Sequence, residues 1–357
     1  MLFKNDTPDL AVPHKSSHLA KKIVIVDGMI GGGKNLLSSI ISSLPNVEMH
    51  LFKYEIEHVC ALNHLGHLSL DAAKTLINMW TDEEIYNQSM SRNTNFRLSD
   101  NSSVFKDARP LRYFKRLFKS PAEATKNIKK KMPVLNLTTH VNTSYSKPLF
   151  EALDERLVYI RVTRHPMTKK MLQHNKKWTE RWTIDDRHGP ILCKTLNSNF
   201  KSIHVPFYAK DIEKSYIDAN PTDKTIMLFD QWIRNSDDFI DKVAKSTKAT
   251  IFEIPYEKFV FQPKMYVEKI ALSLGVTPDN VTNKMMRRQG VPRCSLTDAP
   301  KSKTYLNLGW KYPKKKFTLA ENFAQGRAYA AETASPEALS ILDKLAEDYE
   351  ERHNINK

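Results

Sequence analysis

The stretch from Lys22 to Ser43 constrains the fold most strongly, because it predicts a strand, a glycine-rich loop and a helix in succession. It opens with an apolar, β-branched run at 23–26 that is typical of a buried strand. Gly28 and three consecutive glycines follow, and apolar residues at helical spacing begin after Lys34. Where Cβ atoms are missing, several backbone N–H groups can face one anion, and the helix N-terminus adds its positive end. The stretch therefore predicts a phosphate-binding loop.

The spacing of this loop matches the Walker A pattern G-x-x-x-x-G-K-[ST] at every fixed position except the last. There, Asn35 replaces the hydroxyl residue that contacts Mg²⁺. An amide is not the usual ligand at that position, so the loop indicates phosphate more firmly than a magnesium–ATP complex. The alternative is a glycine-rich turn without a ligand, against which the glycines and the lysine argue. The residues predicted to contact the anion are Gly28, Gly31, Gly32, Gly33, Lys34 and Asn35.

The net charge and the cysteines limit which partners and which cellular compartment the sequence predicts. The net charge of +15 and a pI near 9.5 favour nucleic acid, anionic glycans, membrane surfaces or phosphorylated nucleotides, without choosing among them. The alternative is a lysine-rich surface that serves solubility. No run of eighteen apolar residues and no signal-peptide region occur, so no membrane span is expected. Cys60, Cys193 and Cys294 fit no metal or disulfide pattern, and we expect a cytoplasmic protein with reduced thiols.

The 357 residues are enough for one large α/β domain. We expect a disordered lead-in at 1–20 and a single domain at 21–357, with insertions at about 55–131 and 183–222, the second of them irregular. Strands that alternate with helices predict a mostly parallel central sheet flanked by helices, with the site at its carboxyl edge. Further strands are expected at 47–54, 132–139, 156–162 and 249–254, and helices at 147–153, 225–246, 263–274 and in a segment ending at 178.

Residues 105–131 form the most basic segment, with ten Lys or Arg against two acids. Phe105, Tyr113, Phe114 and Phe118 are interleaved with these charges. Such a pattern fits nucleic-acid or glycan contact, or an amphipathic helix that buries its aromatic side chains. We favour the helix for the aromatic residues and leave the lysine face open to a partner. A histidine pair at 64 and 67 lacks a further ligand nearby, so no metal is expected.

Four segments resemble, in this order, the sulfotransferases that use 3′-phosphoadenosine 5′-phosphosulfate (PAPS). The first two are the loop after Gly28 and the strand that ends in Arg164-His165-Pro166. The other two are Trp232 with the block IPYEKF at 254–259, and Gly309-Trp310-Lys311 with the Phe-Thr-x-x-Glu that follows it. The match spans about 22–349. It implies a P-loop NTPase-like sulfotransferase fold and transfer of a sulfuryl group from PAPS to a hydroxyl or amine acceptor, without a metal.

The same resemblance implies roles for individual residues. Lys34 and the glycine amides would hold the 5′ end of PAPS and its leaving oxygen, and Lys34 would thereby take part in catalysis. Two positions depart from the family: Gly31 replaces a basic residue at the 5′-phosphosulfate, and Leu172 replaces a serine at the 3′-phosphate. These departures leave open a non-catalytic nucleotide- or glycan-binding protein on the same scaffold. The remaining residues implied at the cofactor are Arg164 on the 3′-phosphate, with Tyr256 and Trp310 framing the nucleotide.

His140 is the candidate general base. It follows a predicted strand, and Thr138-Thr139-His140 resembles the Lys-Thr-His of sulfotransferases that use histidine. A neutral imidazole can take the proton of an acceptor hydroxyl; the alternative is a strand-end histidine with local hydrogen bonds only. A P-loop small-molecule kinase is a further alternative, but Asp27 lies too close to the loop and Glu253 lies within a strand. The acceptor is expected to be a small molecule or a glycan, and the basic segment slightly favours an acidic one.

Overall fold

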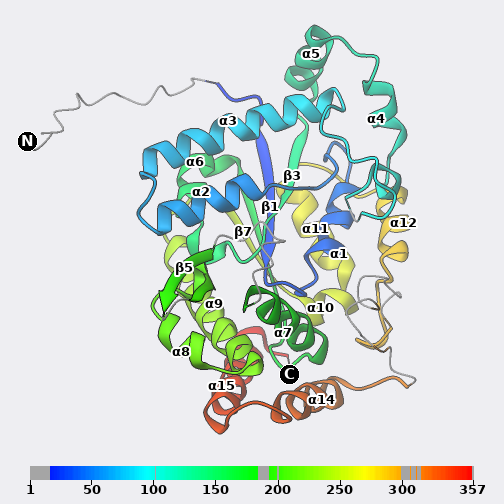
Figure 1. Ribbon diagram of the computed structural model, residues 1–357. Coiled ribbons are helices and arrows are strands. Elements are labelled where there is room, and N and C mark those ends of the chain that lie inside the picture. Colours follow the sequence, from blue (N-terminus) through cyan, green and yellow to red (C-terminus); the bar gives the residue numbers. More distant parts are fainter. Residues whose placement is uncertain are drawn as a thin grey trace, which may run out of the picture.

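The computed structural model describes residues 17–100, 102–183, 193–198, 201–298, 306, 311 and 315–355. A parallel sheet of five strands in the order β2-β3-β1-β4-β7 forms its centre, and helices cover both faces (Figure 1). The predicted α/β class with a parallel sheet is therefore confirmed. The strands are β1 (Lys22–Gly28), β2 (Leu51–Phe52), β3 (Val134–Thr138), β4 (Leu157–Thr163) and β7 (Thr250–Pro255).

The sheet forms here because its strands are apolar on both faces. In β1, Ile23 and Ile25 point to one core, and Val24 and Val26 point to the other, as the two-residue period of a strand requires. The first core is closed by the helices at 54–64, 70–89, 147–153 and 221–243, and the second by those at 34–42, 263–273 and 280–288. β1 pairs with β3 on one side and with β4 on the other, which places the end of β1 at the middle of the carboxyl edge.

The longer helices of the fold are α1 (Lys34–Ser42), α2 (Tyr54–His64), α3 (Leu70–Ser89), α4 (Leu111–Arg116), α5 (Pro121–Lys131), α6 (Lys147–Leu153), α7 (Lys169–Thr183), α8 (Glu213–Asp218), α9 (Pro221–Val243), α10 (Tyr256–Phe261), α11 (Pro263–Ser273), α12 (Asn280–Arg288), α14 (Leu319–Ala331) and α15 (Pro336–His353). Among the described residues, no helix is both long enough and apolar enough to cross a bilayer.

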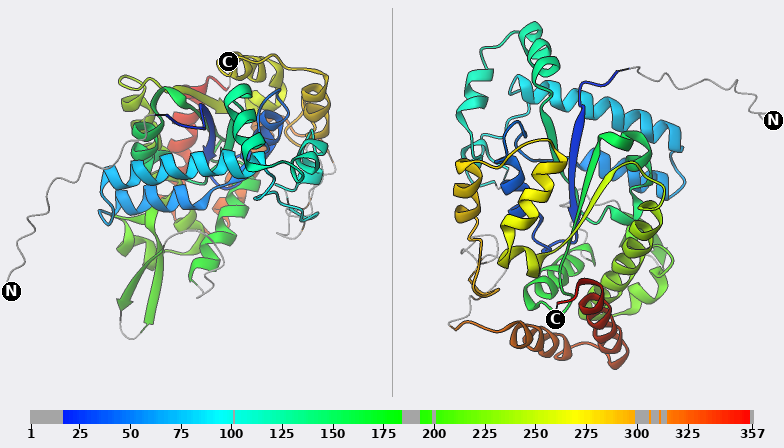
Figure 2. Two further views of the ribbon diagram at one scale, coloured as in Figure 1. Left: turned by 90° about the horizontal axis from the view of Figure 1, so that it is seen from above. Right: turned by 180° about the vertical axis from the view of Figure 1, so that it is seen from behind.

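Three expectations about local structure were wrong. The strand expected at 47–54 shrinks to β2 and one bridge between Val47 and Val134, because α2 already begins at Tyr54. The segment expected to be irregular contains the antiparallel hairpin of β5 (Cys193–Ser198) and β6 (Lys201–Pro206), which stands out from the body in Figure 2. Its strands carry few apolar residues, so their alternation is a weak signal.

The third error concerns the basic segment, which does not bury all of its aromatic residues on one helix. The segment folds into two short helices. Ser120 caps α5 and forms a reciprocal capping box with Glu123, and this capping box starts a second helix after α4. Tyr113 is fully buried, but Phe118 is 89% exposed. In the predicted lead-in, the described residues 17–20 include Leu19, whose N–H donates to Asp82; residues 1–16 lie outside the described part.

Candidate active site

Four loops meet at the carboxyl edge of the sheet, because parallel strands end on the same side. They follow β1, β3, β4 and β7, the strands whose ends the sequence predicted to carry the site. Direct contacts join them: Arg164, after β4, donates to the Gly31 carbonyl oxygen, and the Tyr256 ring, after β7, packs against Gly33. The structure thus brings together the predicted residues that it describes. Trp310 lies outside the described residues.

The loop after β1 can be formed only with glycines. Gly31 and Gly33 have φ angles of +81° and +106°, which residues other than glycine rarely adopt. A Cβ on Gly33 would also lie 2.3 Å from the Tyr256 ring. α1 begins directly after Gly33 with no side-chain cap and no acid in its first turn. The N-terminal N–H groups of α1 are thus left for an anion.

The Lys34 ammonium is folded back onto its own loop. It is buried and donates to the carbonyl oxygens of Gly28 and Met29. Burial lowers the pKa of Lys34 to about 8, although the nearby carboxylates of Asp27 and Glu57 oppose this. An ammonium has three N–H donors, so two bonds to the loop leave a third for a bound anion. Lys34 therefore shapes the loop and can also face the loop's ligand.

A second group of cations surrounds the Tyr256 ring. The guanidinium of Arg164 lies 4.1 Å from the ring centroid, and that of Arg293 lies 5.6 Å from it and donates to the phenol oxygen at 2.7 Å. Lys170, in the first turn of α7, lies in the field of both arginines. Burial and these two charges lower the pKa of Lys170 to about 6. The carboxylate of Glu257, at 4.0 Å from Arg164, offsets only part of the positive charge of this cluster.

Lys170 and Arg293 were not predicted from the sequence. A lysine in the first turn of a helix opposes the helix dipole, and this is a usable signal that an anion is expected there. Arg293 follows a Val-Pro pair in a stretch without regular pattern, so nothing marked it. Leu172, at the departure from the family, is buried in the core. The buried Thr168 hydroxyl, one turn earlier, has no hydrogen-bond partner among the described residues.

His140 lies at the end of β3, next to Glu57 from α2. The imidazole Nδ1 is 3.1 Å from Glu57 Oε1, and the His140 backbone N–H donates to the same oxygen at 3.0 Å. Because Oε1 already accepts from the backbone, we assign Nδ1–H as the donor to it, which leaves the lone pair on Nε2. Burial and the nearby Lys34 charge hold the pKa of His140 well below 6.5. The imidazole is therefore neutral at pH 7.

Glu57 was also missed, because the insertion predicted at about 55–131 was expected to line the acceptor pocket but no residue in it was named for the site. Burial, and then the charge of Asp27, raise its pKa well above 4.5. Two aromatic rings complete this side of the site: Phe52 and Tyr54 stack on His140 at centroid distances of 5.4 and 5.7 Å. The His140 side chain keeps 22% of its surface exposed. It is thus oriented by neighbours but still reachable.

The acids that a magnesium-dependent kinase would need are engaged elsewhere. Asp27 accepts hydrogen bonds from Thr139, Asn142 and Thr143, so it braces the loop after β3. Glu253 pairs with Arg352 at 2.7 Å. In the described part of the chain, no three His, Cys, Asp or Glu side chains gather in a way that could hold a metal ion.

Comparisons with known proteins give matches among solved structures. No protein-family model and no curated protein matches the chain. The sulfotransferase domain of the Synechococcus PCC 7002 olefin synthase is similar at 15% identity, covering 94% of this chain and 96% of that chain, with a TM-score of 0.42. The sulfotransferase domain of the curacin biosynthetic pathway matches at 13% identity over 88% and 99%, with a TM-score of 0.42. Sulfotransferase STF9 from Mycobacterium avium matches at 11% over 94% and 78%, with a TM-score of 0.41. All three are sulfotransferases, the family that the sequence motifs resemble.

Proposed function

We propose that the protein is a sulfotransferase that moves a sulfuryl group from PAPS to a hydroxyl or amine acceptor. The observation that carries the proposal is the presence of two cation sites at one sheet edge. One is the loop with Lys34, and the other is the cluster of Arg164, Lys170 and Arg293 around Tyr256. PAPS has anionic groups at its 5′ and 3′ ends. A nucleoside triphosphate carries its phosphates in a single chain and would bring no phosphate to the second cluster.

Different residues of the chain would bind the two ends of PAPS and accept the proton of the acceptor. Lys34 and the N-terminal amides of α1 would hold the 5′ end and stabilise the charge that develops on the leaving oxygen. Arg164, Lys170 and Arg293 would hold the 3′-phosphate, with Arg164 tied to the first group through the Gly31 carbonyl. PAPS, when bound, supplies the sulfuryl group, whose bond to the 5′-phosphate breaks as the acceptor attacks sulfur. His140 Nε2 would take the proton that the acceptor loses.

The acceptor side of this site is aromatic. Phe52 and Tyr54 flank His140 and offer flat apolar surfaces on which a sugar or an aromatic ring can lie. Glu57 would act as a positioning residue that fixes the tautomer of His140. A small-molecule or glycan acceptor fits this arrangement, and an acidic one fits the charge of +15. We place the protein in the cytoplasm, for which the support is its cysteine usage, with Cys60 and Cys294 as free thiols.

A nucleotide-binding protein without transfer activity is the second candidate. The observation in its favour is the position of the Lys34 ammonium, which contacts its own loop carbonyls, together with a glycine at position 31. In this alternative Lys34 is a structural brace. The nucleotide 3′-phosphoadenosine 5′-phosphate (PAP), which is PAPS without its sulfuryl group, would still bind through Arg164 and its neighbours.

Thermal unfolding with different nucleotides tests the proposal. A ligand that binds only the folded state raises the free energy of unfolding by RT ln(1 + [L]/Kd), about 2.7 kcal/mol at a hundred times Kd. We expect PAP to raise the Tm more than adenosine 5′-phosphosulfate, which lacks the 3′-phosphate, and ATP with Mg²⁺ to raise it least. A larger shift with ATP–Mg²⁺ than with PAP would overturn the proposal. Binding of PAP without turnover of PAPS over a panel of acceptors would favour the second candidate.

A further inference from the structure

The segment from 96 to 132, which we call the basic corner, exposes apolar side chains that a soluble surface normally hides. Of the large apolar side chains that are exposed in the described residues, seven of eleven belong to it. Phe118 is 89% exposed and Leu111 is 70% exposed, at the two ends of α4. The seven are Phe96, Leu98, Phe105, Leu111, Leu117, Phe118 and Met132. Exposed apolar side chains that are concentrated in one segment are typical of an interaction surface.

The cations of the basic corner fall into two groups. Three of its arginines fasten it to the body: Arg116 pairs with Glu48 at 2.7 Å, Arg109 pairs with Asp279 at 2.6 Å, and Arg112 donates to the Val47 carbonyl oxygen at 2.7 Å. Its exposed lysines have no ion pair among the described residues; they are Lys115, Lys126, Lys129, Lys130 and Lys131. The arginine contacts therefore hold the basic corner firmly against the body, and the lysine charges remain available to a partner.

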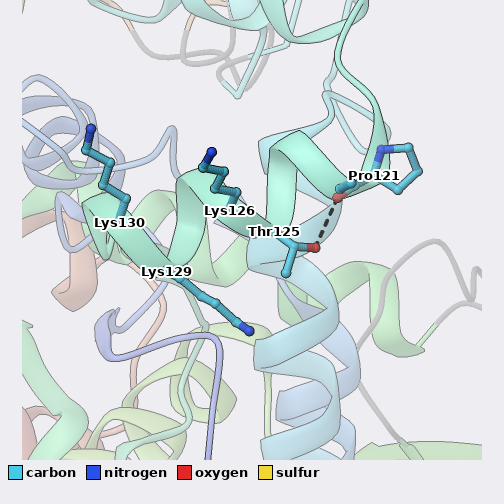
Figure 3. Close-up of a pocket in the computed structure, with 6 residues that line it drawn as sticks. Pro121, Thr125, Lys126, Lys129 and Lys130 are labelled. Atoms are coloured by element: carbon cyan, nitrogen blue, oxygen red, sulfur yellow. Dashed lines mark hydrogen bonds between the residues drawn. The ribbon is translucent and has the colours of Figure 1, made fainter.

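The lysines of α5 do not enclose a ligand. An open hollow runs along α5 and is lined by residues of this one helix: Pro121, Ala122, Thr125, Lys126, Lys129 and Lys130. Figure 3 shows Lys126 and Lys130 projecting from the same side of the helix, while Lys129 leaves it at a different angle. A small molecule would need walls from several elements to be held. The surface suits a broad, anionic partner.

We propose that the basic corner docks the protein onto a membrane that contains anionic phospholipids. Leu111, Leu117 and Phe118 would enter the boundary between headgroups and acyl chains, and the exposed lysines would lie at the lipid phosphates. A polyanion such as RNA would use the lysines, but it gives an aliphatic side chain such as Leu111 no apolar phase to enter. The combination of exposed leucine, phenylalanine and unpaired lysine is what a lipid interface satisfies.

The position of the basic corner gives this docking a direction. α5 leads into the start of β3, at the amino ends of the strands, and Figures 1 and 2 show α4 and α5 at the end of the molecule opposite α14. The candidate active site lies at the carboxyl ends. A protein held by the basic corner would therefore turn its active site away from the lipid, toward acceptors in solution. The inference does not depend on the proposed chemistry, because it uses none of the same residues.

Sedimentation of the full-length protein with vesicles tests the proposal. We expect binding to vesicles of phosphatidylcholine and phosphatidylserine, and little binding to phosphatidylcholine alone. Replacing Lys126, Lys129 and Lys130 with alanine should weaken the partition coefficient by about fivefold per lysine, or roughly a hundredfold in all. Phe118→Ser should weaken it by at least about tenfold. These side chains are exposed, so the Tm should not change.

Matched variants on α11 and α12 provide the controls. Leu272, 81% exposed, gives Leu272→Ser as the counterpart of Phe118→Ser, and alanine at Lys264, Lys269 and Lys284 is the counterpart of the triple lysine variant. We expect both controls to bind vesicles as the wild type does. Equal binding to the two vesicle types, or wild-type binding by Phe118→Ser, would overturn the proposal. Binding to single-stranded RNA but not to vesicles would overturn it in favour of a nucleic-acid surface.

Discussion

The two cationic regions of this molecule differ in how far their charges are removed from water. At the active-site edge, Lys34 and Lys170 are desolvated, and their pKa values fall to about 8 and about 6. In the basic corner, lysines such as Lys126 and Lys130 stand in solvent. A buried cation is costly until an anion arrives, whereas an exposed one costs little and attracts weakly. We therefore expect the first region to bind the compact anionic groups of a nucleotide, and the second to meet an extended surface.

The difference also shows in how the cations are held. Arg164 has a fixed direction, because its Nη1 donates to the Gly31 carbonyl oxygen and its plane lies over the Tyr256 ring. The flexible lysine stems of α5 have no such partners in the part of the chain that the structure describes. Fixed donors give specificity for a phosphate of defined position. Mobile charges follow any negative surface and lose strength as salt screens them. The net charge of +15 alone does not distinguish fixed cations from mobile ones.

The largest expected effect concerns His140, which separates chemistry from anion binding. His140→Ala should lower sulfuryl transfer by roughly 10²–10⁴-fold, the usual contribution of acid–base catalysis, and leave PAP affinity nearly unchanged. Because the pKa of His140 lies well below 6.5, the rate of the wild type should already be at its plateau at pH 7 and fall only in more acidic solution. Steady-state rates and PAP titrations measure the two quantities.

His67→Ala is the matched control, since this exposed histidine lies between α2 and α3. Its rate should equal that of the wild type. Glu57→Gln keeps a hydrogen bond to His140 but removes the charge, and it should lower kcat by less than His140→Ala. If His140→Ala transfers sulfuryl groups at the wild-type rate, the base is another residue.

An intermediate effect is expected at Arg164 and sharpens the contrast between fixed and mobile cations. Lysine cannot reproduce the bidentate geometry of a guanidinium. Arg164→Lys should therefore weaken PAP by roughly tenfold to a hundredfold, while adenosine 5′-phosphosulfate, without a 3′-phosphate, should be much less affected. Lys129→Ala in the basic corner is the control and should change neither affinity. Equal losses for both nucleotides would show that Arg164 is structural.

The sequence was informative where one physical requirement acts on adjacent residues. The loop after β1 needs glycines, and the apolar β-branched run before it makes a strand buried on both faces, so both were predicted. The placement of Arg164, Tyr256 and His140 at one edge followed from the parallel sheet alone. Glu57, Lys170 and Arg293 could not be found this way. They reach the site through tertiary packing of α2, α7 and the loop after α12. The lysine in the first turn of α7 indicates an anion, but no local pattern shows which elements meet there.

The basic corner shows the opposite limit. Alternating aromatic and basic residues predict an amphipathic helix, and the buried Tyr113 fits that interpretation. The capping box at Ser120, however, starts a new helix after α4 and leaves Phe118 in solvent. A local signal, the Ser-Pro-x-Glu sequence, was present and outweighed the longer periodicity. Exposure of an apolar side chain depends on which face its helix turns to the body, and the arginine ion pairs decide that.

The smallest expected effect is a pH dependence of nucleotide affinity that arises from Lys170. The free protein holds this amine largely neutral at pH 7, because burial, Arg164 and Arg293 lower its pKa to about 6. A bound phosphate favours the ammonium and raises that pKa again, so binding takes up a proton. PAP affinity should therefore fall as pH rises between about 7 and 8, by at most about tenfold per unit. Calorimetry in two buffers with different ionisation enthalpies measures the uptake.

Lys170→Arg tests the assignment, because a guanidinium stays charged throughout this range. The part of the proton uptake that belongs to Lys170 should disappear in this variant, and what remains should reflect Lys34, whose pKa is about 8. Lys129→Ala should keep the full uptake of the wild type, because Lys129 lies in the basic corner and not at the candidate active site. Unchanged uptake in Lys170→Arg would mean that Lys170 does not meet the 3′-phosphate. The lowered pKa of Lys170 would then reflect its packing near Arg164 and Arg293, and not a site for an anion.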